Sequence, residues 1–251
     1  MKWNPFRKRR RIIALLAFRN EMRFLPDYFA SVASMVDGIV ALDDGSTDGS
    51  TEFVASRPEV LELIRVPIRE PHEWNDALNH RRLVEASWKY RPDWLIGLDA
   101  DERLEIGFRQ RADEIIDRAQ LAGERAFRLH VREIWDDPGQ FRMDGVWGTK
   151  SSARLFEART DHEFHMQTLH CHWAPLNSKV NGDFLQADLT LYHLRMLHQA
   201  DREARRLRYE TLDPNREQQS IGYAYLTDTA GLTLQRITAG REYQPLPSTE
   251  P

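Results

Sequence analysis

The sequence predicts an α/β protein with a central, mostly parallel mixed sheet and helices on both faces. Short apolar runs of strand length alternate with segments of helical periodicity over the first hundred residues. The apolar runs are continuous rather than alternating, which is typical of parallel strands buried on both faces. Two of the runs end in carboxylates, and open α/β sheets bind ligands at the carboxyl ends of their strands.

Composition favours one soluble domain in a reducing compartment. The chain has 251 residues, of which 41% are hydrophobic, enough for a single core of good size. Its net charge of −4 indicates no nucleic-acid partner. The single cysteine, Cys171, excludes an intrachain disulfide and favours a cytoplasmic location. No apolar run approaches the roughly 20 residues that a membrane span needs.

Residues 1–11 form a basic arm in which Trp3 and Phe6 interleave with the charges. One interpretation is contact of residues 2–11 with an anionic membrane, at about 1 kcal/mol for each basic residue near the surface. The protein would then lie peripherally at the inner membrane face. The other interpretation, a solvated leader into the first strand, is the one we favour.

The elements follow in order. Apolar runs predict four strands, at 12–18, 39–42, 60–66 and 94–98. Apolar residues at helical spacing predict three helices between them, at 24–35, 51–57 and 74–90. The second half is less regular, with a helix at 105–122, a strand at 126–134, a turn at 136–139, short strands within 141–156, a strand at 189–194 and a charged helix at 199–211.

Two acidic segments lie where strands are expected to end. Asp99 and Asp101 would share a face if the fourth strand continued through them. Such oxygen ligands suit Mg²⁺ or Mn²⁺ carrying a phosphate, although a solvated acidic turn explains them as well. After the second strand, Asp43 and Asp44 can accept hydrogen bonds from a ribose or a base. A tight turn with a helix N-cap at Ser50 or Thr51 explains the other residues of that loop.

Together these motifs resemble the inverting family 2 glycosyltransferases, which have the Rossmann-like GT-A fold. The resemblance rests on three stretches in this order, Ile12 to Glu21, Asp43-Asp44-Gly45-Ser46-Thr47-Asp48-Gly49-Ser50 and Leu98-Asp99-Ala100-Asp101-Glu102. It is strong over residues 12–105 and looser over 106–212. It implies one GT-A domain over 12–212, with a nucleotide-sugar half (12–105), an acceptor half (106–212), and a C-terminal extension and flexible tail (213–251).

The resemblance also implies residue roles. Ala17 would lie against the nucleobase, and Asp44 would accept a hydrogen bond from it. Asp101 would bind Mn²⁺ or Mg²⁺ directly, Asp99 would face the ribose and a metal-bound water, and His193 would complete the metal site or be structural. The residues implied to bind the nucleotide-sugar are Ala17, Arg19, Glu21, Asp44, Arg81 or Arg82, Asp99 and Ala100.

An inverting transfer also needs a general base near the acceptor hydroxyl. The candidates are Asp137 and then Asp136, in the turn after the strand at 126–134. Many relatives carry a Val-His-Glu-like element further along the chain. The matching stretch here, Leu169-His170-Cys171-His172, has cysteine in place of the glutamate, which excludes a carboxylate base there.

Three other groups of residues can each be interpreted as functional or as structural. The histidines at 162, 165, 170 and 172 suggest zinc, but their spacing is not that of a known structural site. The basic helix with arginines at 202, 205, 206 and 208 could contact donor phosphates or an anionic acceptor lipid, or be a solvated face. Tryptophans at 135, 147 and 173 could stack on sugars or belong to the core.

The sequence thus predicts a metal-dependent inverting glycosyltransferase. It would move a sugar from a nucleotide-diphospho-sugar to a hydroxyl of a saccharide or glycolipid acceptor, in cell-surface polysaccharide or glycolipid synthesis. The alternative is a catalytically silent nucleotide- or carbohydrate-binding domain on the same scaffold. Cys171 and the lack of an obvious base favour that alternative, whereas the intact Asp99 and Asp101 argue against it.

Overall fold

The computed structural model describes residues 9–168, 171–179 and 182–246. Most of the basic arm, Leu169, His170 and residues 247–251 therefore lie outside the described residues, including most of the predicted membrane contact. None of the described helices is both long enough and apolar enough to cross a bilayer.

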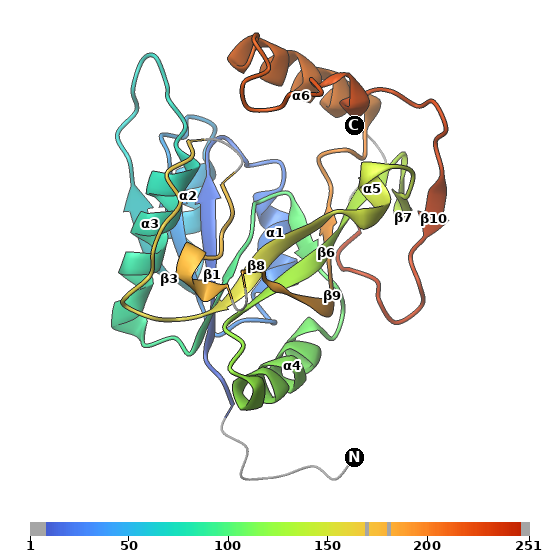
Figure 1. Ribbon diagram of the computed structural model, residues 1–251. Helices are drawn as coiled ribbons and strands as arrows, with labels where there is room; N and C mark the ends of the chain where they lie inside the picture. The colour runs from blue at the N-terminus through green and yellow to red at the C-terminus, as the bar shows by residue number, and fades with distance from the viewer. Residues whose placement is uncertain (1–8, 169–170, 180–181, 247–251) are drawn as a thin grey trace.

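In the described part of the chain, ten strands form one mixed sheet, and the α/β fold is confirmed (Figure 1). The strand order is β10-β7-β6-β8-β4-β1-β2-β3, with β9 paired to β6 and β5 paired to β9. The strands are β1 (Ile12–Phe18), β2 (Ile39–Asp43), β3 (Val60–Arg65), β4 (Trp94–Gly97), β5 (Glu102–Leu104), β6 (Ala126–Trp135), β7 (Asp137–Arg142), β8 (Ser151–Glu157), β9 (Leu185–His193) and β10 (Leu234–Arg236). Strands β1 to β4 pair in parallel, as their apolar runs predict, whereas β8 runs antiparallel to β4.

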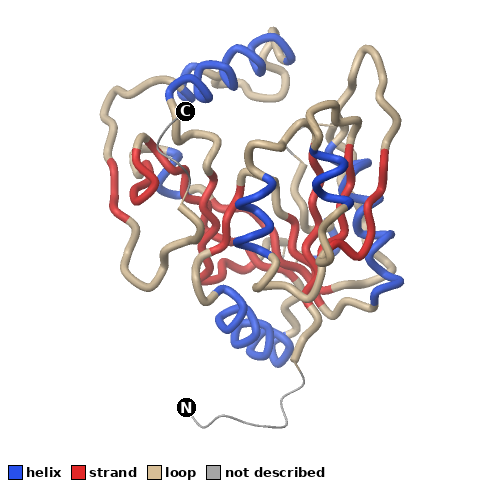
Figure 2. Tube along the Cα trace, turned by 180° about the vertical axis from the view of Figure 1, so that it is seen from behind, coloured by secondary structure: helices blue, strands red, loops and turns tan. Residues whose placement is uncertain are grey.

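Helices cover both faces of the sheet. They are α1 (Leu25–Val32), α2 (Ser50–Ala55), α3 (Asp76–Ser87), α4 (Phe108–Ala122), α5 (Val146–Thr149) and α6 (Gln199–Leu212), with 3₁₀ turns η1 (Trp88–Tyr90), η2 (Leu176–Ser178) and η3 (Ala224–Leu226). Strand β1 is fully buried, and its residues alternate between a core shared with α1, α2 and α4 and a core shared with α3. The α6 helix lies at the end of the sheet opposite to α4 (Figure 1 and Figure 2).

Local structure departs from the sequence expectations at several points. The α2 helix is not capped by Ser50 or Thr51, because Gly49 is the N-cap residue and Asp48 accepts from the Ser50 N–H at 3.0 Å. The expected turn at 136–139 is shorter: Asp136 has a φ of 60° and β7 begins at the next residue. Within 141–156 the structure has α5 before β8 rather than strands alone.

The C-terminal extension packs onto the domain as far as it is described. Tyr223 and Leu226 join Trp135 and Trp147 in a third hydrophobic cluster. Tyr243 is fully buried and its hydroxyl donates to the Pro138 carbonyl at 3.0 Å. Within the expected flexible tail, Tyr243 is therefore held against β7.

Gly97 at the end of β4 is required for the packing of Trp173. A Cβ atom at this position would lie 2.0 Å from the Trp173 ring. We expect Gly97→Ala to destabilise the protein by about 1–3 kcal/mol, the usual cost of overpacking a core. In a Trp173→Leu background the same change should cost much less, which a double-mutant cycle of urea unfolding measures. Equal costs in both backgrounds would contradict this account.

Candidate active site

A cavity of about 990 Å³ opens at the carboxyl ends of β1 and β4. Its walls come from the segment after β1, the acidic turn after β4, the start of β8, residues 171–173 and the α6 helix. Segments from both halves of the chain therefore meet here, at the edge of the sheet where open α/β folds bind ligands.

The acidic turn at 98–102 closes on itself. The Glu102 N–H donates to the Asp99 carbonyl at 3.0 Å, and the Asp99 N–H donates to Glu102 Oε2 at 2.9 Å. Because β4 ends at Gly97, the two aspartates do not share a strand face. The Asp99 side chain is 45% exposed, whereas Asp101 is buried. A purely solvated turn is thus the wrong interpretation, and Glu102 orients the turn.

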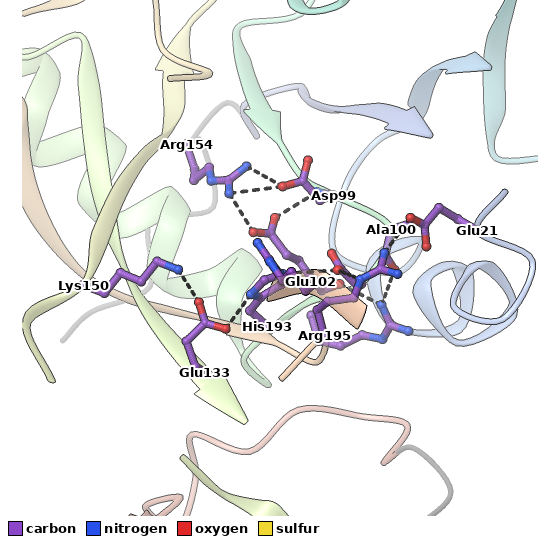
Figure 3. A network of polar contacts seen from close by, with 12 residues as sticks. Glu21, Asp99, Ala100, Glu102, Glu133, Lys150, Arg154, His193 and Arg195 are labelled. Carbon is purple, nitrogen blue, oxygen red and sulfur yellow. Dashed lines mark hydrogen bonds and ion pairs between the residues drawn. The ribbon is translucent and has the colours of Figure 1, made fainter. Parts of the chain in front are cut away.

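The pairing of β5 with β9 brings His193 beside this turn (Figure 3). His193 Nε2 lies 3.2 Å from Asp101 Oδ2, and its Nδ1 lies 2.6 Å from Glu133 Oε2. All three side chains are buried. The imidazole therefore lies between two carboxylates.

These contacts determine the charge of the imidazole. Burial alone would lower the pKa of His193, but the carboxylates of Glu133 and Asp101 raise the pKa to about 9. The pKa of Glu133 is well below its ordinary value, because His193 and Lys150 outweigh the effect of burial. Near neutral pH the group is an imidazolium held by two carboxylates.

Arg195 extends the network to the end of β1. Its Nε donates to Asp101 Oδ2 at 2.6 Å and its Nη2 donates to Glu21 Oε1 at 2.5 Å. Burial raises the pKa of Glu21 to about 7 in spite of Arg195. The pKa of Asp101 stays well below its ordinary value, since Arg195 and His193 overcome burial.

A second arginine holds the other side of the turn. Arg154 Nη2 donates to Glu102 Oε1 at 2.7 Å and lies 3.4 Å from Asp99 Oδ2. Burial raises the pKa of Glu102 to about 8, against the opposing effect of Arg154. Asp99 is therefore the acidic side chain of this turn that is most accessible from the cavity.

The structure brings several of the sequence-predicted residues together. Those that line the cavity are Ala17, Arg19, Glu21, Asp99, Ala100, Asp101 and His193. Asp44 lies behind the cavity wall, where its Oδ2 accepts from Asn79 and His72, each at 3.2 Å. Of these three, only His72 lines the cavity.

Besides Asp44, four further predicted residues do not line the cavity. Arg81 is exposed on α3 and pairs with Glu85 at 2.8 Å, and Arg82 lies beside it. The expected bases Asp136 and Asp137 lie in the β6–β7 turn, because β6 continues past the cavity before the chain reverses. Asp136 accepts from Arg202 at 2.7 Å, and Asp137 accepts from the Gly139 N–H at 2.7 Å.

The structure also bears on the tryptophans and on the zinc hypothesis. Trp173 lines the cavity and stacks on His80 at a ring distance of 3.7 Å. Trp135 and Trp147 belong to the core. Across residues 9–168, 171–179 and 182–246, no three His, Cys, Asp or Glu side chains form a ready metal-binding group, and the zinc hypothesis for His170 falls outside the described residues.

Sequence reasoning missed Glu133, Arg154 and Arg195. Glu133 carried a usable signal, because Phe127, Leu129 and Val131 alternate inward along β6 and Glu133 continues that series. A carboxylate at a core-facing position of a strand indicates a buried partner. Arg154 and Arg195 had no comparable signal, since their partners are 52 and 94 residues away.

Sequence comparison finds two relatives and no family. No protein-family model matches the chain. Two curated relatives, uncharacterized proteins of Mycobacterium bovis and Mycobacterium tuberculosis, are each 29% identical over 153 residues, which cover 57% of this chain. The chain spans about a third of the length of these relatives, since the match covers 35% of each.

Among solved structures, the crystal structure of S. aureus TarS matches with a TM-score of 0.51 at 10% identity, over 80% of this chain and 40% of that chain. A crystal structure of glucosyl-3-phosphoglycerate synthase from Mycobacterium tuberculosis with Mn²⁺, UDP and glucosyl-3-phosphoglycerate matches at a TM-score of 0.34 and 19% identity, over 50% of this chain and 44% of that chain. The fold conclusion rests on the first match. The chain has the GT-A fold.

The charge of His193 provides a direct test of the buried network. We expect Glu133→Gln to lower the pKa of His193 from about 9, because only the Asp101 carboxylate then stabilises the imidazolium against burial. NMR titration of the His193 ring measures it. Glu62 on β3, whose carboxylate pairs with Lys89 of η1, provides the control: in Glu62→Gln the pKa of His193 should stay near 9.

The raised pKa of His193 also makes the free energy of unfolding depend on pH. A raised histidine pKa stabilises the fold below pH 6.5, and this contribution is lost as the pH rises through about 9. The loss of stability over this range should be smaller in Glu133→Gln than in the wild type. A wild-type His193 that titrates near 6.5 would contradict the network.

Proposed function

We propose that the protein is a metal-dependent inverting glycosyltransferase that uses a nucleotide-diphospho-sugar. The observation that carries the proposal is the meeting of the acidic turn with His193 in a cavity of about 990 Å³, on a GT-A fold. A transfer of this kind makes a diphosphate leaving group, and a divalent ion bound beside it would stabilise the developing charge.

The residues present fit such an ion. Asp101 Oδ2 and His193 Nε2 are 3.2 Å apart. Neighbouring ligands of an octahedral ion with bonds of about 2.1 Å are about 3 Å apart. Carboxylate oxygen and imidazole nitrogen suit Mn²⁺. Asp99, which lies 3.4 Å from Arg154 Nη2, would have to turn toward them to add a further oxygen. Glu133 on Nδ1 would orient the ring, as carboxylates commonly do for metal-bound histidines.

Binding an ion requires three rearrangements within the network. His193 must lose the proton on Nε2, and Arg195 must leave Asp101 Oδ2. The Arg205 guanidinium, whose Nη1 lies 3.3 Å from His193 Nε2, must also move away from that nitrogen. The Arg195 side chain is 29% exposed and lines the cavity. It can therefore turn toward a diphosphate while it keeps its ion pair with Glu21.

The donor would lie along the β1 end of the cavity. Ala17 and Arg19 both line the cavity there. The Arg19 Nε–H donates to the Gly45 carbonyl at 3.3 Å, which holds the guanidinium at the cavity surface. Asp44 would recognise the base together with His72, because the His72 ring contacts Asp44 and lines the cavity.

The general base must be a carboxylate that reaches the cavity and is not committed to the metal. Because Asp136 and Asp137 do not line the cavity, we assign the role to Asp76 or Asp201, which do. Asp201 pairs with Arg23 through Oδ1 at 2.8 Å, and its Oδ2 has no hydrogen-bond partner in the described structure. Within this proposal the acceptor is a saccharide or glycolipid, and the reaction takes place in the cytoplasm.

A silent binding domain remains the second candidate function. The observation in its favour is that Arg195 and a protonated His193 already satisfy Asp101, so the acidic site is balanced by the protein's own charges. Such a domain would bind nucleotide equally well with and without metal.

We expect one of UDP-, GDP- or dTDP-sugars to raise the melting temperature only when Mn²⁺ is present, and to be turned over. Asp101→Asn should reduce turnover at least about 100-fold, because metal stabilisation of the leaving group contributes several kcal/mol. Asp161→Asn, which alters an exposed aspartate paired with Arg159, is the matched control and should leave turnover unchanged.

Urea unfolding of both variants separates a lost metal ligand from a lost fold. Full activity of Asp101→Asn, or of the wild type in EDTA, would rule out the metal-dependent mechanism. Nucleotide binding without metal and without turnover would favour the silent domain.

A further inference from the structure

The four arginines of α6 have different environments. Arg202 is buried and donates to the carbonyls of Met196 and Leu197 at 2.7 and 3.0 Å. Arg206 pairs with Glu210 at 2.8 Å. Arg205 and Arg208 instead line the cavity, together with Asp201. Positions 201, 205 and 208 lie on one face of a helix.

Arg205 and Arg208 differ from the other cations of the second-half wall in lacking an acidic partner. Lys150 pairs with Glu133, Arg154 with Glu102, and Arg195 with Asp101. In the described structure, no carboxylate lies within ion-pair distance of Arg205, whose Nη1 is 3.3 Å from Nε2 of the His193 imidazolium. Its Nε is buried without a partner.

Arg208 is exposed and forms no hydrogen bond or ion pair with any residue that the structure describes. Two guanidinium groups on one helix face, aimed into a cavity and without acidic partners, are a site for an anion with several oxygens.

Resting on the proposed function, we propose that Arg205 and Arg208 bind a phosphate ester of the acceptor. In the proposed function the donor diphosphate lies at Asp101, His193 and Arg19, whereas α6 and the start of β8 form the wall contributed by the second half of the chain. Arg205 borders the donor site, because its Nη1 is 3.3 Å from His193 Nε2, and Arg208 lies farther along α6. An acceptor held by Arg205 and Arg208 would also lie beside Asp201, a carboxylate assigned above as a candidate base.

The test is a calorimetric titration of the full chain with glycerol 3-phosphate in the presence of Mn²⁺ and UDP. Glycerol 3-phosphate should bind and glycerol should not. Arg205→Gln and Arg208→Gln should each weaken binding at least about tenfold, because each removes a charge-assisted contact. Arg206→Gln, the matched control on the same helix, should bind as the wild type does.

Two further arms identify the source of the phosphate and the site. Phosphatidylcholine vesicles with and without phosphatidic acid replace glycerol 3-phosphate, and binding that depends on Arg208 in this arm alone identifies a lipid phosphate. UDP affinity is measured in the same variants and should not change in Arg208→Gln. Since Arg208 is exposed, this variant should fold normally.

The proposal is overturned if neither phosphate probe binds, or if Arg206→Gln weakens binding of the probe as much as Arg208→Gln does. It is also overturned if Arg208→Gln weakens UDP binding as much as it weakens binding of glycerol 3-phosphate. That result would place the arginines on the donor diphosphate. Failure of UDP to bind the wild type would instead count against the proposed function. In that case, Arg208-dependent binding of glycerol 3-phosphate to the protein alone would still support the phosphate site.

Discussion

The short pairing of β5 with β9 fixes the position of the charged groups in the cavity. Glu102 pairs with His193, and the Leu194 N–H donates to the Asp101 carbonyl at 2.9 Å. The other edge of β9 pairs with β6 in a register that puts Glu133 opposite His193. One backbone register therefore places a histidine between a carboxylate from the first half of the chain and a carboxylate from the second.

This constraint explains why so many charged side chains can be buried together. Cations and carboxylates alternate from Lys150 through Glu133, His193, Asp101 and Arg195 to Glu21. Removing one member of a buried pair typically costs about 3–5 kcal/mol, because its partner is left uncompensated. In the proposed function, a cation that replaced the His193 proton and the Arg195 contact would preserve the alternation.

Much of the fold could be predicted from the sequence because its first half follows simple periodicities. Continuous apolar runs identified β1 to β4, and carboxylates at strand ends identified Asp99 and Asp101 as parts of one cavity. Strand β5 was missed because it has only three residues and forms only through its pairing with β9. Arg81 and Arg82 were misleading, although the buried residues Leu83 and Val84 define the inner face of α3 and place Arg81 on the outer one. The choice of Asp136 and Asp137 relied on turn chemistry, which does not reveal that β6 passes the cavity at Val131, before it reaches the turn.

Pulsed electron paramagnetic resonance of Mn²⁺ on the full chain with UDP tests the central claim most directly, because it detects the nuclei bound to the ion. The account predicts coupling to one imidazole ¹⁴N and to ³¹P of the nucleotide. The ¹⁴N coupling should disappear in His193→Gln and persist in His198→Gln. Mn²⁺ that shows no nitrogen coupling in the wild type, or a coupling that survives in His193→Gln, would contradict a metal–diphosphate site at Asp101 and His193.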